Sequence, residues 1–75
     1  MLKRKQAKKI AKHFDKLIEE LHKANKGNGI LLSQARAESF VKALELAEVI
    51  DRFTSEEMRE TIIETEQNAY KKMLP

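Results

Sequence analysis

The residues in this chain that could do acid–base or metal chemistry are two histidines and three serines. At about 100° per residue, His13 and His22 point to nearly opposite sides of one predicted helix, and no cysteine or tight carboxylate cluster completes a metal site around either. Ser33, Ser39 and Ser55 have no general base at a spacing that the sequence reveals. We therefore expect no catalytic residue, no metal ligand and no cofactor, and a protein that is not an enzyme.

The stretch KGNG at residues 26–29 is a candidate phosphate-binding loop, because glycines let backbone N–H groups approach a phosphate. It lacks the G-x-x-x-x-G-K-[ST] spacing and the preceding strand of a phosphate-binding loop. Gly27 instead suits the left-handed position that ends a helix. The consecutive carboxylates Glu56 and Glu57 diverge on a helix and do not share a site. We therefore expect no small-molecule substrate.

The densest charge lies at the start of the chain, where LKRKQAKKIAKH (residues 2–13) contains six basic residues and no acidic one. Residues 1–26 hold nine basic and three acidic residues, whereas residues 27–75 hold six basic and nine acidic. At about 100° per residue, five lysines fall opposite Ile10 and Phe14. They form the basic stripe, which consists of Lys5, Lys8, Lys9, Lys12 and Lys16. The pattern predicts that this stripe faces solvent.

Two interpretations of the basic stripe stay open. It can contact the phosphates of nucleic acid, which gives salt-sensitive and largely sequence-independent affinity. It can also be a solvated face that keeps an oligomer soluble or meets an acidic protein partner or an acidic helix of a neighbouring molecule. A helix-turn-helix reader is disfavoured because Glu56, Glu57 and Glu60 would open its recognition helix. We expect no membrane binding, because the apolar side has the width of a bundle core and lacks Trp.

Apolar spacing predicts three helices, at about 3–26, 34–53 and 55–73. The inner side of the first helix would carry Ala7, Ile10, Ala11, Phe14, Leu17, Ile18 and Leu21. Ser33 is the expected N-cap of the second helix, with Ile30 and Leu31 closing one end of the core. Thr54 and Glu57 match the S/T-x-x-E capping box of the third. Short connections then predict an all-α fold, an antiparallel three-helix bundle, as a single domain over residues 1–75.

The second and third helices carry more apolar positions than one bundle core takes up. The surplus positions predict an oligomer interface made of Leu46, Ile50, Phe53, Ile63, Tyr70 and Leu74. An exposed strip of this size is unusual on a small soluble protein, so we expect a homodimer through helices 2 and 3. In the alternative, the bundle core absorbs both apolar lines of the middle helix and the protein is a monomer.

Composition sets the broad class. The chain has no cysteine and no apolar run near the roughly 18 residues that span a bilayer, so we expect a cytoplasmic protein of a bacterium or phage. The sequence favours a small helical interaction module of the regulator or adaptor type, homodimeric and acting through protein–protein contacts. The alternative is a nucleic-acid-binding accessory protein that contacts phosphates through the basic stripe.

Overall fold

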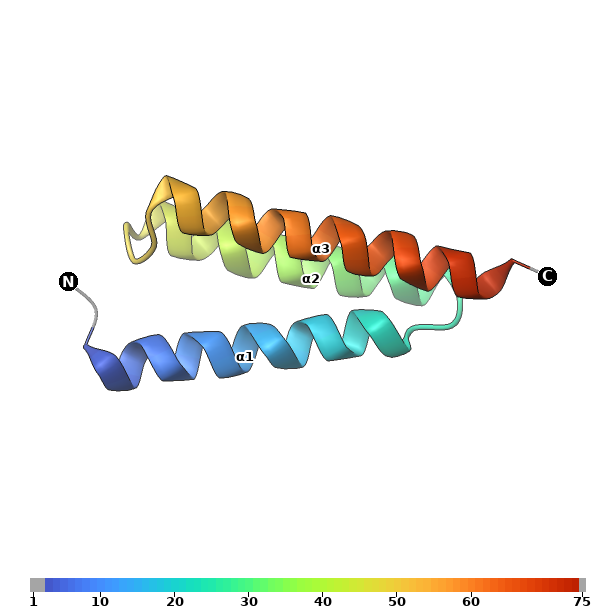
Figure 1. Cartoon of the computed structure of the whole chain (residues 1–75), viewed down its shortest axis with the longest axis horizontal. Coiled ribbons are helices and arrows are strands. Elements are labelled where there is room, and N and C mark those ends of the chain that lie inside the picture. Colours follow the sequence, from blue (N-terminus) through green and yellow to red (C-terminus); the bar gives the residue numbers. More distant parts are fainter. Residues whose placement is uncertain (1–2, 75) are drawn as a thin grey trace.

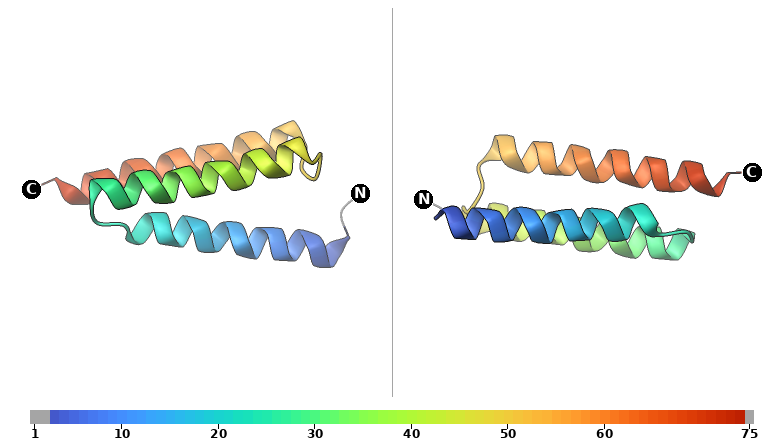
Figure 2. Two further views of the ribbon diagram at one scale, coloured as in Figure 1. Left: turned by 180° about the vertical axis from the view of Figure 1, so that it is seen from behind. Right: turned by 60° about the horizontal axis from the view of Figure 1, so that its bottom comes forward.

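The computed structural model describes residues 3–74, and within them the chain is all-α, as predicted. The helices are α1 (Arg4–Lys23), α2 (Gly27–Leu46) and α3 (Arg52–Met73). They lie lengthwise beside one another, each packing on the other two, in a shape of 47 × 20 × 16 Å (Figure 1). Along the long axis α1 and α3 run in one direction and α2 in the other (Figure 2).

The core lies between the three helices and takes apolar side chains from each. Its buried members are Phe14, Leu17, Leu21, Ile30, Ala37, Val41, Ile62 and Ala69. On α1 the buried residues begin only at Phe14, since Ile10 is half-buried and Ala7 and Ala11 are exposed. The predicted inner side of the first helix is therefore covered over its C-terminal half alone.

The first connection, residues 24–26, corrects the predicted turn at Gly27. α1 ends at Lys23 instead of 26, and α2 begins at Gly27 instead of 34, so that Ser33 lies inside the helix and is not its N-cap. No glycine among the described residues has a positive φ. The early start places Ile30 in the core with no exposed surface. Its burial contributes about 2 kcal/mol, which offsets roughly 0.5–1 kcal/mol for each glycine in the first turn.

The second connection, residues 47–51, shows that the predicted extension of the second helix to residue 53 is wrong. α2 ends at Leu46, and Glu48 takes a left-handed conformation with φ of 57°. The N–H of Glu48 donates to the carbonyl of Glu45 at 3.0 Å, and the N–H of Val49 donates to the carbonyl of Leu44 at 2.9 Å. These two bonds form a Schellman motif, whose left-handed position glycine usually occupies. Glycine spacing could therefore not reveal this helix end.

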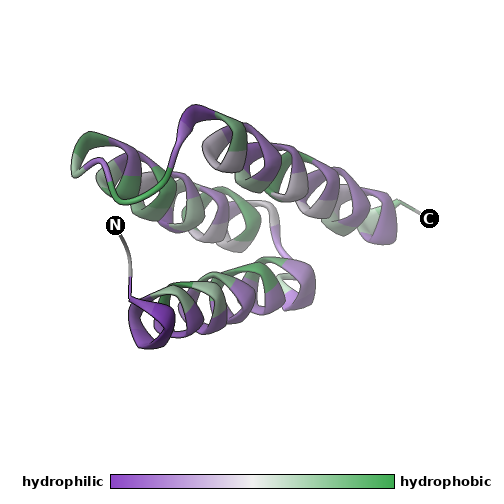
Figure 3. Ribbon diagram, turned by 60° about the vertical axis from the view of Figure 1, so that its left-hand side comes forward, coloured by the Kyte–Doolittle hydropathy of each residue, from purple (hydrophilic) through white to green (hydrophobic). Residues whose placement is uncertain are grey.

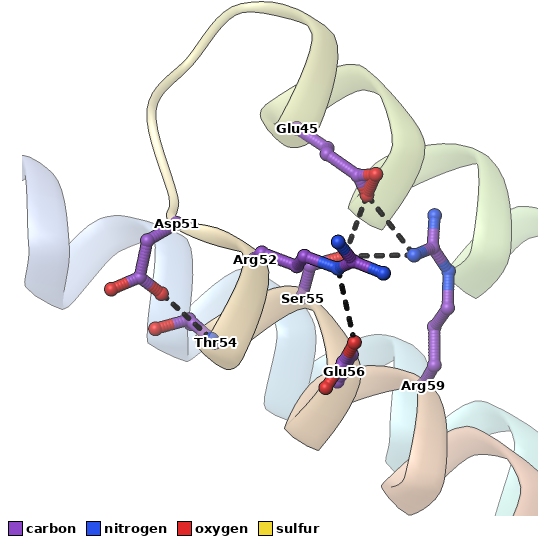
Figure 4. A network of polar contacts seen from close by, with 7 residues as sticks. All are labelled: Glu45, Asp51, Arg52, Thr54, Ser55, Glu56 and Arg59. Atoms are coloured by element: carbon purple, nitrogen blue, oxygen red, sulfur yellow. Dashed lines mark hydrogen bonds and ion pairs between the residues drawn. The ribbon is translucent and has the colours of Figure 1, made fainter.

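The start of α3 corrects the predicted capping box. Asp51 is the N-cap, and its Oδ1 accepts a hydrogen bond of 2.7 Å from the backbone N–H of Thr54 (Figure 4). This hydrogen bond lowers the pKa of Asp51. A carboxylate at this position also interacts favourably with the positive end of the helix dipole. The helix thus begins at Arg52 instead of 55, and neither Thr54 nor Glu57 caps it.

A polar cluster joins the end of α2 to the start of α3 (Figure 4). The buried Ser55 hydroxyl donates to Glu45 Oε2 at 2.7 Å and accepts from Arg59 Nη1 at 2.9 Å. Arg59 Nη1 also lies 3.0 Å from Glu45 Oε2. The hydrogen bonds from Ser55 and Arg59 lower the pKa of Glu45. Ser55, for which the sequence reveals no general base, is therefore a structural link between two helices.

Candidate functional site

The basic stripe lies on the solvent side of α1. All five of its lysines are exposed, and they project away from the side that buries Phe14, Leu17 and Leu21. Figure 3 shows the same division, with hydrophilic residues along the outer side of α1. Within residues 3–74, none of the five ammonium groups lies within 4.0 Å of a carboxylate oxygen. The positive charge of the stripe is therefore not neutralised by ion pairs inside the described molecule.

One acidic residue falls in line with the basic stripe and is engaged elsewhere. Glu19 Oε1 lies 2.8 Å from Lys23 Nζ, one turn further along α1. The hydrogen bond and the attraction of the Lys23 ammonium lower the pKa of Glu19, and the same contact raises the pKa of Lys23. The acid is thus paired away from Lys16, and the stripe stays positive along its length.

The predicted oligomer residues do not form one continuous strip. Leu46, Phe53 and Leu74 are 75, 69 and 71% exposed, and Ile63 and Tyr70 are exposed to a smaller degree. Ile50 differs from them, since it is half-buried against the core in the connection between α2 and α3. Phe53, predicted at the end of the second helix, belongs to α3.

The exposed members of this set fall at two ends of the molecule. Leu46 and Phe53 flank the α2–α3 connection, whereas Tyr70 and Leu74 lie at the far end of α3. The seventeen helical steps from Phe53 to Tyr70 correspond to about 25 Å of helix. One compact interface on a small partner cannot cover both ends equally.

The sequence did not predict the exposure of three further apolar residues. They are Leu31 and Leu32 at the start of α2, both 55% exposed, and Met73 at the end of α3. Leu31 was expected to close the core, but with α2 starting early Ile30 takes that position alone. Leu31 lies fourteen residues before Glu45 and Met73 fourteen after Arg59, so both lie at the end away from the Glu45–Arg59 pair.

An open groove of about 440 Å³ lies between the N-terminal half of α1 and the segment from Val49 to Met58. Its apolar lining includes Ala7, Ile10, Ala11, Phe14, Ile50 and Met58, and Asp15, Asp51 and Thr54 add polar groups. The sequence did not predict this groove, because helical periodicity assigned Ala7, Ile10 and Ala11 to a closed core. No spacing signal could have revealed it, because residues 49–54 include the large apolar Val49, Ile50 and Phe53, and only the structure shows that Phe53 does not cover the groove.

The histidines lie apart, as their spacing predicted. The His13 ring packs edge-on against Phe40 with 4.7 Å between ring centroids. His22 Nε2 lies 3.0 Å from Lys72 Nζ at the opposite side of α1. No group of three or more His, Asp or Glu side chains within residues 3–74 is arranged to hold a metal ion. None of the helices in this part of the chain is long and apolar enough to cross a membrane.

Comparisons with known proteins add no relative to these observations. No protein-family model matches the sequence, and neither the curated proteins nor the solved structures contain a match. Two features of the described surface remain as indications of function: the basic stripe and the exposed apolar side chains.

Proposed function

We propose that this protein is a non-enzymatic helical interaction module of the regulator or adaptor type. In this proposal the three helices form an antiparallel bundle, and two copies pair through apolar side chains of α2 and α3. The observation that carries it is the exposure of Leu46, Phe53 and Leu74, each about 70% exposed on a chain of 8.7 kDa. Large exposed apolar groups on a small soluble protein are typical of a surface that another protein covers.

The size of the chain supports the same proposal. A domain of this length buries only about 60% of the surface of its unfolded chain, so its stability margin is thin. A two-fold contact uses one patch twice and adds burial without new sequence. Pairing therefore both covers the apolar residues and adds to stability.

The test is the molar mass in solution, measured by light scattering over a range of protein concentrations. We expect twice 8.7 kDa for the wild type. Exchanging an exposed apolar residue for a charged one, as in Phe53→Asp or Tyr70→Asp, identifies which end of α3 carries the contact. Gln67→Asp, at an exposed polar position between them, is the control. A mass of 8.7 kDa at every concentration contradicts the homodimer.

The second candidate function is contact with nucleic-acid phosphates through the basic stripe. The observation that favours it is that none of the five lysines pairs with a carboxylate within residues 3–74. Free ammonium groups on one helix face can displace counterions from a duplex. If all five contact phosphates, the logarithm of the affinity should fall against the logarithm of salt with a slope of about −4 to −5.

Fluorescence anisotropy with a labelled DNA duplex, at several salt concentrations, tests this candidate. The triple variant Lys8→Glu, Lys9→Glu, Lys12→Glu should lose binding. A matched triple that changes the net charge equally, Arg36→Glu, Lys42→Glu, Lys71→Glu, places the same reversal at exposed positions on α2 and α3. Equal loss in both triples indicates a response to net charge alone, and the absence of wild-type binding at low salt rejects the candidate.

A further inference from the structure

The N-terminal half of α1 has an apolar side that its own chain leaves uncovered. Ala7, Ile10 and Ala11 have the spacing of a packed helix, yet Ala7 and Ala11 are exposed and Ile10 is half-buried. The groove of about 440 Å³ runs along these residues. Its volume lies in the range of about 300–1,000 Å³ found for sites that enclose a group of drug size, which is ample for one aromatic side chain.

The most exposed aromatic ring of the described chain stands beside this groove. Ile50, Asp51 and Thr54 line the groove, whereas Phe53 between them is 69% exposed. Around α3, Phe53 lies about 100° from Thr54 and about 140° from Met58, the two α3 residues of the groove. Phe53 therefore points away from the groove of its own molecule and is presented to another one.

We infer that the groove is filled by Phe53 of a second copy, and that the pairing is reciprocal. This inference rests on the proposed homodimer. It keeps Phe53 of α3 as the anchor but places it against α1 of the second copy instead of against α2. In a two-fold dimer each molecule supplies one ring and one groove, so that a single patch is used twice. Each aromatic side chain buries about 150–250 Å² in such a contact. The same contact covers Ala7, Ile10 and Ala11, which their own chain leaves exposed or half-buried.

Charge at the two rims of the groove supports a second copy as its occupant. Arg4 and Lys8 lie on the same side of α1 as Asp15, which lines the groove. On α3, the side that carries Phe53 also carries Glu57, Glu60 and Glu64, all exposed. Lys71 lies on the same side of α3 near its end, so the acidic rim is the part of this side from Glu57 to Glu64, and the basic rim is the start of α1.

The direction of the helices selects the orientation of the pair. α1 and α3 run the same way along the molecule (Figure 2). A two-fold axis parallel to the helices lays α1 of one copy on α3 of the other, so each basic rim meets an acidic rim. An axis across the helices would lay α1 on α1 and oppose lysine to lysine. Of these two orientations, only the first sets opposite charges against each other.

The first turn of α1 adds to the positive charge at this end of the helix. No acidic residue lies in the first turn of α1, so the positive end of its dipole is not compensated locally. The outer lysines Lys9 and Lys16 stay in solvent on the far side of the helix.

The experiment uses two single variants and their mixture, followed by sedimentation equilibrium. Phe53→Ala removes the ring and leaves the groove open. Ala11→Phe, at an exposed position, fills the groove of its own molecule and keeps Phe53. Each variant alone should raise the dissociation constant of the dimer about 100-fold, as expected for the loss of an aromatic anchor. Unchanged helical circular dichroism checks that both variants fold.

The equimolar mixture of the two variants is the decisive sample. A mixed pair seats the intact Phe53 of the Ala11→Phe chain in the open groove of the Phe53→Ala chain, whereas neither variant has such a site alone. We expect the mixture to dimerise at least tenfold more tightly than either variant. If all variants and the mixture pair as tightly as the wild type and only Tyr70→Asp dissociates, this inference is overturned and the homodimer stands. A monomeric wild type rejects both.

Discussion

The two ends of the molecule differ in how completely the helices cover the apolar side of α1. At the end where α1 connects to α2, Leu21, Ile30 and Ala69 come from three helices and have no exposed surface. At the other end the corresponding side of α1 is open, with Ile10 half-buried and a groove of about 440 Å³ beside it. Apolar periodicity thus indicates that a residue is to be covered, but it does not say by which chain.

The difference follows from how each helix is held. The three-residue connection keeps the end of α1 against the start of α2. At the open end, α2 and α3 are joined by a connection and by the Glu45–Ser55–Arg59 cluster, so they stay together. No hydrogen bond or ion pair between side chains in residues 3–74 ties the first half of α1 to them. The groove is therefore open because the first half of α1 is not held against α2 and α3, whereas α2 and α3 are held together.

The largest expected effect compares core truncations at the two ends. Leu21→Ala should lower the free energy of unfolding by about 3 kcal/mol, because it leaves a cavity among fully buried groups. Ile10→Ala should cost only about 1 kcal/mol in the monomer, because the side chain is half-buried already. Urea denaturation measures both, at a protein concentration low enough to dissociate the proposed dimer. Equal losses would show that the groove is closed in solution.

Relief of backbone strain at the open end should have the next largest effect. Glu48 holds φ at 57°, which costs an L-residue about 1 kcal/mol relative to glycine. Glu48→Gly should therefore raise the free energy of unfolding by about 1 kcal/mol, even though glycine usually destabilises. Chemical denaturation measures the gain, and Glu48→Ala, which keeps the strain, is the matched control. A loss in the glycine variant would contradict the Schellman end of α2.

At the end where α1 connects to α2, replacing a glycine, instead of introducing one, should stabilise the protein. Gly27 has an ordinary helical start, and a Cβ added there meets nothing within 4 Å. Gly27→Ala should therefore raise the free energy of unfolding by roughly 0.5 kcal/mol, because alanine reduces the freedom of the unfolded chain. Thermal denaturation measures this as a higher melting temperature. Gly29→Ala, whose Cβ would lie 3.9 Å from Ala24 Cβ, should be tolerated likewise. Destabilisation by both variants would indicate that Gly27 and Gly29 form the turn that the sequence predicted, and not the first turn of α2.

The smallest effect is the pH dependence of the link between α2 and α3. Ser55 and Arg59 lower the pKa of Glu45 from its ordinary value of 4.5. A carboxyl whose pKa is lower in the folded state stabilises the fold above its ordinary pKa and loses this contribution as pH falls through the folded value. Stability should therefore decrease below about pH 4.5, and less so in Glu45→Gln.

The control for the pH experiment is Glu20→Gln, since Glu20 is exposed and makes no hydrogen bond or ion pair through its side chain within residues 3–74. Asp51 and Glu19 also have lowered pKa values, so a residual slope should remain in Glu45→Gln. Urea denaturation at several pH values between 3 and 6 compares the three proteins. Identical slopes in wild type and Glu45→Gln would show that the cluster does not contribute to stability.

The sequence determined those features that depend on periodicity alone. Three helices follow from apolar spacing, and the positions of Phe14, Leu17 and Leu21 in the core and of the basic stripe opposite them follow from about 100° per residue. These features need no knowledge of neighbouring helices. They were accordingly predictable from residues that lie on one helix.

Only the tertiary structure decided where the helices begin and end and which apolar residues stay uncovered. At Gly27 the burial of Ile30 outweighed a local turn signal, and at Glu48 the reversal of the chain imposed a conformation that glutamate does not favour. Ile10 has the spacing of a core residue, yet no helix of its own chain reaches it fully. Local signals are worth about 1 kcal/mol each, so contacts between helices, which sum over many side chains, override them.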